Sequence, residues 1–372
     1  TLTVGVSNVA PTVSSAASAP EPSLEGGAVN FSALCADAGF LDTIAYTWNY
    51  GDLTANATGA NASHTYANQG NFSVTLVCSD GDGGAATSVF TQRVSNVAPA
   101  VNSALSGANP SDEGASVQFT GSCSDPGTSD TISYLWVFSD GSPNATGAAV
   151  NHTFADEGNF TVSLWCSDTD GGATQANLSQ AVRNVAPTVA SAAASGALSE
   201  GQAVNFTALC TDPGTLDVLT YSWSFGDASG PAAGAAASHV YLDDGAYTAT
   251  LTCSDGDGGS VATNLNVVIG NLAPSVQISG LNLTDEGTLV AFGSLVSDPG
   301  VLDTFIYSWD FADGSAGASV ANTSHRFADN GVFAVVLSVR DNGGAVSQAT
   351  MIVVVRNVAP TVGVNVTGNW VE

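Results

Sequence analysis

The sequence contains no lysine and only five arginines, against 33 aspartates and glutamates, so its formal net charge is −28. Phosphate backbones and anionic lipid headgroups are bound by neutralising Lys and Arg side chains. The composition therefore excludes nucleic acid and membrane surfaces as partners and makes cations the natural ligands. No apolar run approaches the roughly 18 residues of a membrane-spanning helix, so no membrane insertion is expected in this segment.

Helical periodicity is also lacking, and apolar residues alternate with polar ones instead. In residues 28–35, Val29, Phe31 and Cys35 share one face, and residues 71–78 repeat this pattern. Gly, Asn, Asp and Pro interrupt the chain at short intervals, as turns require. The pattern predicts an all-β protein built from β-sandwiches.

A four-residue tag, N-V-A-P or N-L-A-P, begins at Asn8, Asn96, Asn184, Asn271 and Asn357, at intervals of 88, 88, 87 and 86 residues. The tag proline stiffens the backbone on both sides, so consecutive repeats are expected to form a rod-like array. The signal peptide of a secreted protein is expected to have been removed or to lie upstream. The predicted domains are the last strand of a preceding repeat (1–7), repeat 1 (8–95), repeat 2 (96–183), repeat 3 (184–270), repeat 4 (271–356) and the first strand of a following repeat (357–372).

Each repeat contains a tryptophan motif followed by a His-x-aromatic strand. The motif reads W-N-Y-G-D at 48–52, W-V-F-S-D-G at 136–141, W-S-F-G-D at 223–227 and W-D-F-A-D-G at 309–314. These motifs resemble the signature of the polycystic kidney disease (PKD) domain in all four repeats. The resemblance implies tandem immunoglobulin-like sandwiches of an extracellular or microbial cell-surface protein. Departures at Val137, Ser139 and Ala312 fall in a turn, so the expected fold is unaffected.

Six cysteines fall into pairs that are always 43 residues apart: Cys35 with Cys78, Cys123 with Cys166, and Cys210 with Cys253. Repeat 4 has Val296 and Val339 at these two places, so both cysteines are lost together. This pattern predicts three buried disulfides and hence an oxidising, extracellular compartment. Free buried thiols are the alternative, and zinc is disfavoured because each repeat offers too few ligands.

An aspartate follows each cysteine, or its valine replacement, by two residues. In the implied fold the two bridged strands run in the same direction, so both aspartates and the tag asparagine should meet at one end of the repeat. Some PKD repeats of secreted enzymes bind calcium near this end, and Ca²⁺ prefers six to eight oxygen ligands. The predicted calcium ligands are Asn8, Asp37, Asp80, Asn96, Asp125, Asp168, Asn184, Asp212, Asp255, Asn271, Asp298 and Asp341, with further carboxylates nearby at Asp42, Asp130, Asp217 and Asp303. The alternative is that these aspartates only accept hydrogen bonds within their own turns.

The sequence also holds about twice the number of Asn-x-Ser/Thr sequons that its composition gives by chance. Where the register can be read, these asparagines point away from the core, as N-linked glycans require. Accidental sequons in Asn-rich and Thr-rich strands are the alternative. The predicted glycosylation sites are Asn30, Asn56, Asn61, Asn71, Asn144, Asn151, Asn159, Asn177, Asn205, Asn282, Asn322 and Asn365.

No singular catalytic constellation stands out, so no enzyme activity is expected. Each repeat has one histidine at the same position (His64, His152, His239 and His325), which indicates a structural role. We expect a structural protein, a stalk, fibre or sheath of a microbial cell surface, whose partners are neighbouring repeats of the same or identical chains and extracellular polysaccharide or protein. The alternatives are spacer or carbohydrate-binding or protein-binding modules of a larger secreted hydrolase, and an acidic surface protein of a halophile without calcium.

Overall fold

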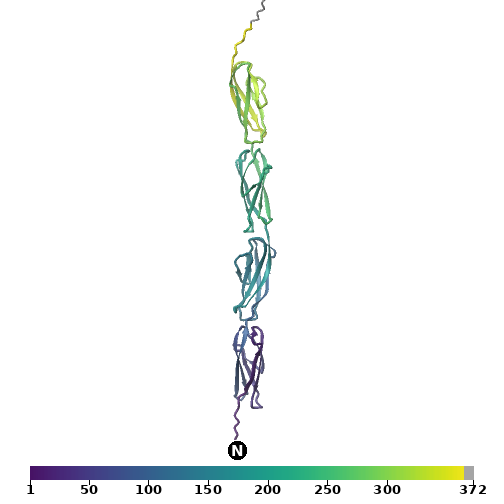
Figure 1. The fold of residues 1–372 in the computed structure, drawn as a ribbon, viewed down its shortest axis with the longest axis vertical. Helices are drawn as coiled ribbons and strands as arrows, with labels where there is room; N and C mark the ends of the chain where they lie inside the picture. Colours follow the sequence, from purple (N-terminus) through teal and green to yellow (C-terminus); the bar gives the residue numbers. More distant parts are fainter. Residues whose placement is uncertain (364–372) are drawn as a thin grey trace, which may run out of the picture. The chain divides into compact units, whose positions relative to one another are not determined.

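The structure, a computed structural model, describes residues 1–363. These residues form strands and connecting loops, without a helix (Figure 1). None of these residues belongs to a helix that is long and apolar enough to cross a membrane. The prediction of an all-β chain of tandem sandwiches is confirmed, because each repeat has two sheets whose inner faces share one apolar core.

Repeat 1 shows the plan of all four. Its smaller sheet has the strand order β1-β3-β6, and its larger sheet has the order β2-β8-β7-β4-β5. The pairs are antiparallel except for the short strand β2, which runs parallel to β8. The strands are β1 (Thr12–Ala19), β2 (Ser23–Leu24), β3 (Ala28–Ala36), β4 (Ala45–Asn49), β5 (Ala57–Thr58), β6 (Asn61–Thr65), β7 (Gly70–Ser79) and β8 (Ala85–Ser95).

The other repeats keep this topology with small changes in the edge strands. Repeat 2 contains β9 (Ala100–Ser106), β10 (Ser111–Asp112), β11 (Ser116–Ser124), β12 (Ser133–Phe138), β13 (Ala145–Thr146), β14 (Ala149–Thr153), β15 (Gly158–Ser167) and β16 (Ala173–Arg183). Repeat 3 contains β17 (Thr188–Gly196), β18 (Ala203–Thr211), β19 (Thr220–Ser224), β20 (Ala232–Ala233), β21 (Ala236–Val240), β22 (Gly245–Ser254) and β23 (Ser260–Ile269). Repeat 4 contains β24 (Ser275–Gly280), β25 (Leu283–Asp285), β26 (Leu289–Ser297), β27 (Ile306–Asp310), β28 (Thr323–Arg326), β29 (Gly331–Arg340) and β30 (Val346–Arg356).

One tryptophan stands at the centre of each core. Trp48 is fully buried between the two sheets of repeat 1, where its ring packs 5.6 Å from that of Phe31 on β3. Its Nε1–H donates to the carbonyl oxygen of Gly59 at 3.0 Å, so the polar atom of the ring is satisfied. The equivalents Trp136, Trp223 and Trp309 are buried to the same degree.

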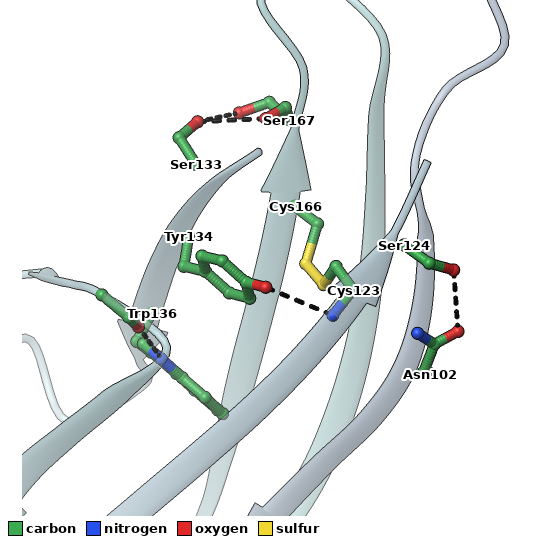
Figure 2. Close-up of a disulfide and its surroundings, with 9 residues drawn as sticks. Asn102, Cys123, Ser124, Ser133, Tyr134, Trp136, Cys166 and Ser167 are labelled. Carbon is green, nitrogen blue, oxygen red and sulfur yellow. Dashed lines mark hydrogen bonds between the residues drawn. A yellow bond between two sulfur atoms is a disulfide. The ribbon is translucent and has the colours of Figure 1, made fainter. Parts of the chain in front are cut away.

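The three cysteine pairs are disulfide-bonded, and each bond joins the two sheets of its repeat. Figure 2 shows the pair Cys123 and Cys166, which links β11 to β15 beside Trp136. The backbone N–H of Cys123 donates to the hydroxyl of Tyr134 at 3.4 Å, which ties the bridge to the neighbouring strand β12. In repeat 4, Val339 is fully buried in the place of the second cysteine, so an apolar contact replaces the covalent bond there.

The repeats differ in length only between the tag and the acidic-Gly turn, in the first strand and the loop after it. The first strand of repeats 1, 2 and 3 contains a β-bulge against its neighbour, between Val13 and Ser15 in β1 for example. The equivalent strand β24 pairs with β26 without a bulge. A bulge inserts one extra residue into one strand of a pair, so its loss accounts for one residue of the shorter fourth interval.

Residues 1–7 form no strand here, and their assignment to the last strand of a preceding repeat stays a prediction. A β-strand needs a neighbour to receive its backbone hydrogen bonds, and none of the described residues pairs with this segment. Residues 357–363 likewise form no strand, and 364–372 lie outside the described residues. The described chain divides into two compact units, Thr1–Val185 with Pro213–Leu216, and the remainder. We call these the N-terminal unit, with repeats 1 and 2, and the C-terminal unit, with repeats 3 and 4.

Candidate metal-binding poles

The tag asparagine and the aspartate after the second cysteine, or after its valine replacement, meet at the entry end of repeats 1, 2 and 4. We call the entry end of a repeat its pole. Asn8 donates from Nδ2 to Oδ2 of Asp80 at 2.9 Å. The same bond joins Asn96 to Asp168 at 3.0 Å, and Asn271 to Asp341 at 3.1 Å. This bond lowers the pKa of Asp80 below its ordinary value, although burial acts in the opposite direction.

The aspartates of the poles also cap their own turns, as the alternative interpretation expected. Oδ1 of Asp80 accepts the backbone N–H groups of Asp82 at 2.9 Å and Gly84 at 3.0 Å. Oδ1 of Asp37 accepts the N–H of Gly39 at 2.6 Å. Turn chemistry therefore uses one oxygen of each carboxylate and leaves the other for a different partner.

Several of these second oxygens are buried without a hydrogen-bond partner. They include the Oδ2 atoms of Asp37, Asp125, Asp298 and Asp341 and the Oδ1 atoms of Asn96 and Asn271. A buried acceptor without a donor is costly, since it has lost its water and gained nothing in return. Carboxylate and amide oxygens are the ligands of Ca²⁺, so the donor set of the poles fits this ion.

The loop aspartates complete the poles of repeats 3 and 4. One carboxylate oxygen each of Asp298, Asp303 and Asp341 lie within 4.8 Å of one another, and Asp212, Asp217 and Asp255 are grouped in the same way. Burial and the charges of Glu200 and Asp298 raise the pKa of Asp303 to about 7. Asn184 is half-buried in its tag ahead of β17. The poles of repeats 3 and 4 thus unite predicted ligands that follow two strands with one further loop carboxylate.

A buried glutamate, which the sequence analysis missed, lies in the acidic-Gly turn ahead of the first cysteine strand. Glu25 is 1% exposed, and its Oε1 accepts the backbone N–H of Val97 in the next tag at 2.7 Å. The sequence signal was the E-G pair found in every repeat at a constant 72 residues before the second tag residue. The same bond joins Glu113 to Val185 at 2.6 Å, Glu200 to Leu272 at 2.6 Å, and Glu286 to Val358 at 2.9 Å.

This glutamate also faces the pole of the following repeat within each unit. In the N-terminal unit, oxygens of Glu25, Asp125 and Asp130 lie within 4.8 Å of one another. Burial and the charge of Glu25 raise the pKa of Asp130 to about 6. In the C-terminal unit, Glu200 and Asp303 are grouped in the same way with Asp243 and Asp244.

The comparison with protein families decides what kind of repeat this is. The family model described as the PKD domain matches residues 8–94, 96–182, 184–269 and 271–355. The chain belongs to the PKD domain family. PKD repeats are non-catalytic modules, and together with the disulfides they indicate an extracellular setting.

Among proteins with similar sequences, human Polycystin-1 is 30% identical over 237 residues, which cover 57% of this chain and 5% of Polycystin-1. Immunoglobulin domains 1–5 of Sidekick-1 match 91% of the chain and 78% of that structure, with 14% identity and a TM-score of 0.31. Cadherin domains 3–6 of protocadherin gamma B2 match 93% of the chain and 100% of that structure, with 14% identity and a TM-score of 0.24. The chain thus spans a small part of Polycystin-1.

The histidine of each PKD repeat pairs with the aspartate of the tryptophan motif. His64 lies 2.6 Å from Asp52, from Nε2 to Oδ2, and stacks on the ring of Tyr50 with centroids 4.0 Å apart. Burial by itself would raise the pKa of Asp52, but hydrogen bonds from Thr54 and His64 outweigh it and lower this pKa. The same pair recurs as His152 with Asp140, His239 with Asp227, and His325 with Asp313. The repeated histidine is therefore structural, since it holds the motif turn against β6 and its equivalents.

The His–Asp pairs predict a loss of stability in acid. Because the folded state holds the pKa of Asp313 below its ordinary value, the ionised Asp313 stabilises repeat 4 above the ordinary pKa of about 4, and this effect is lost as the pH falls through the lowered pKa. We expect Asp313→Asn to remove roughly 1 to 3 kcal/mol at pH 7 and less at pH 3. Urea unfolding across this pH range measures the change, with the exposed Asp329→Asn as control. An equal loss at both pH values would contradict the assignment.

Proposed function

We propose that this chain is a structural segment of an extracellular protein, a stalk, fibre or sheath at a cell surface, in which PKD repeats hold their neighbours in fixed register. The observation that carries this proposal is a hydrogen bond. In each repeat, the buried or half-buried glutamate accepts the backbone N–H of the second residue of the tag that follows the repeat. Glu25, Glu113, Glu200 and Glu286 make it without exception. A hydrogen bond to a charged acceptor contributes about 1.5 to 3 kcal/mol, which favours one exit direction of the chain.

Close packing inside each unit supports the same role. A side chain at Gly26 would place its Cβ 2.6 Å from the carbonyl oxygen of Pro126 in the next repeat, so only glycine fits there. Gly201 has the same relation to Pro299, at 2.5 Å. Repeats that touch through backbone atoms, without an intervening spacer, have little freedom to bend.

Calcium and glycan belong to the same proposal. Ca²⁺ at the poles would pair the buried acceptor oxygens, and the carboxylates it joins come from different strands and loops of the repeat, so it would stiffen the entry end. The eleven described sequon asparagines are all exposed, which leaves room for N-linked glycans, while Asn365 lies outside the described residues. Glycans on a stalk would shield it from proteases and from lateral association.

Electron microscopy of the purified chain tests the structural proposal. We expect rods of uniform length in calcium and a greater spread of bend angles after chelation, because the repeats are joined without spacers. Globular particles, or a necklace equally flexible in both buffers, would contradict it. Retention of the chain on chitin, cellulose or collagen would favour the alternative of a binding module from a secreted hydrolase.

A further inference from the structure

We propose that the joint between repeats 3 and 4 contains a second cation site, made by Glu200, Asp243 and Asp244 of repeat 3 and Asp303 of repeat 4. Ca²⁺ is the ion that fits, since every ligand is a carboxylate oxygen and no His or Cys takes part. This site lies beside the pole of repeat 4 and shares Asp303 with it. It rests on the proposed function and adds a cation shared by two repeats.

The geometry brings four carboxylates from two repeats to one point. One oxygen of each lies within 4.8 Å of the others. The bond from the Leu272 N–H holds Glu200 against the tag. Asp303 is held in a turn, where its own backbone N–H donates to Gly300 O at 3.2 Å. Two of the four ligands, Glu200 and Asp303, are therefore placed before any ion binds, which lowers the cost of ordering them.

A buried oxygen without a partner points into this cluster. Glu200 is 0% exposed, and while its Oε1 accepts the Leu272 N–H, its Oε2 has no hydrogen-bond partner. A Cβ at Gly300 would lie 2.6 Å from Glu200 Oε2 and 2.8 Å from Asp303 Oδ2, so both oxygens face the space that this glycine leaves free. The two oxygens of Asp303 are also buried without partners.

The charges at the joint call for a cation that the protein does not supply. Four carboxylates this close repel one another strongly where water is excluded. The chain has no lysine, and Arg93, Arg183 and Arg356 pair with carboxylates elsewhere. Arg326 donates to the carbonyl oxygen of Gly287, and Arg340, near Gly344, forms no ion pair with the described carboxylates of this joint. A divalent cation would turn this repulsion into attraction and would draw repeats 3 and 4 together.

The joint between repeats 1 and 2 repeats the arrangement with fewer charges. Glu25 is 1% exposed with an unpartnered Oε2, and a Cβ at Gly127 would lie 2.8 Å from that oxygen and 2.5 Å from Asp130 Oδ2. Asn68 and Gln69 stand where repeat 3 has Asp243 and Asp244. Because calcium affinity rises with the number of charged ligands, we expect the joint between repeats 3 and 4 to bind more tightly.

The test uses Glu200→Gln in the full chain, with Glu286→Gln as the matched control. Glutamine keeps the acceptor for the Leu272 N–H and removes only the charge. Glu286 makes the same tag bond, to Val358, but the described residues place no loop aspartate of another repeat against it. Calcium titration by calorimetry and hydrogen exchange of the Leu272 amide are measured in all three proteins.

We expect Glu200→Gln to weaken one class of calcium sites by at least about tenfold and to abolish the slowing of Leu272 exchange by calcium, while the control behaves as wild type. Asp298→Asn, which removes a ligand of the pole of repeat 4 and no ligand of the shared site, should weaken mainly a different class. If calcium binds with the same affinities to the wild type and to Glu200→Gln, the shared site is overturned, and the proposal of calcium at the poles is unaffected. If no calcium binds to the wild type, both fail. If Glu200→Gln stabilises the calcium-free protein and calcium has no effect, a proton shared by Glu200 and Asp303 replaces the proposed ion.

Discussion

Replacing Trp309 by alanine should destabilise repeat 4 by about 3 to 5 kcal/mol and leave the stability of repeat 3 unchanged. The ring is 2% exposed between the two sheets, and its Nε1–H donates to Val320 O at 2.9 Å. Loss of a buried tryptophan costs about 3 to 5 kcal/mol, against about 5 to 15 kcal/mol for a whole domain. Repeat 4 is the most sensitive repeat because it has no disulfide to limit its unfolded state. Hydrogen exchange of the β29 amides measures the effect, and the β22 amides serve as an internal reference.

Trp165→Ala is the control for this substitution. Trp165 lies on β15 and is 38% exposed, so its removal leaves no cavity and should change the free energy of unfolding by about 0.5 kcal/mol or less. Similar losses from both substitutions would mean that the tryptophan between the sheets does not organise the core.

Replacing Cys210 and Cys253 together by valine should destabilise repeat 3 by about 2 to 4 kcal/mol. The bond closes a loop of 43 residues, and it acts mainly by restricting the unfolded chain. Valine is the natural choice, since repeat 4 has Val296 and Val339 at these positions and packs them in its core. The expected loss therefore comes from the missing covalent bond and not from a cavity. Urea unfolding with exchange measured in β18 and β22 provides the value.

Chemical reduction of the wild-type chain is the companion experiment. It should destabilise repeats 1, 2 and 3 by similar amounts and leave repeat 4 unchanged. A valine pair as stable as the native disulfide would show that the bond is dispensable once the core is packed.

The strands and the cysteine pairs could be predicted from the sequence, because they depend on local alternation of apolar residues and on repetition. Alternating apolar residues identified β3 and β7, and the paired loss of two cysteines in repeat 4 indicated which residues pair. These signals are strong because a strand with one buried face must place every second residue inward. Four copies of each pattern also separate a structural requirement from chance.

The sequence could not show the role of Glu25, because this depends on two segments 72 residues apart coming together. An E-G pair looks like an ordinary turn until the fold puts Val97 beside it. The pole ligands were found only in part for the same reason. Turn capping and ion binding use the same aspartates, such as Asp37, and only the three-dimensional structure shows that each function can take a different oxygen.

The constant interval between each glutamate and its tag has a consequence for how such a protein can change length. Asn8 precedes Glu25 by 17 residues, Asn184 precedes Glu200 by 16 and Asn271 precedes Glu286 by 15, whereas the 72 residues from glutamate to tag never vary. Insertions and deletions thus fall in the first strand and the loop after it, outside the part that sets the joint. A gene for this protein could gain or lose whole repeats by unequal recombination, and every new junction would already contain both halves of its contact.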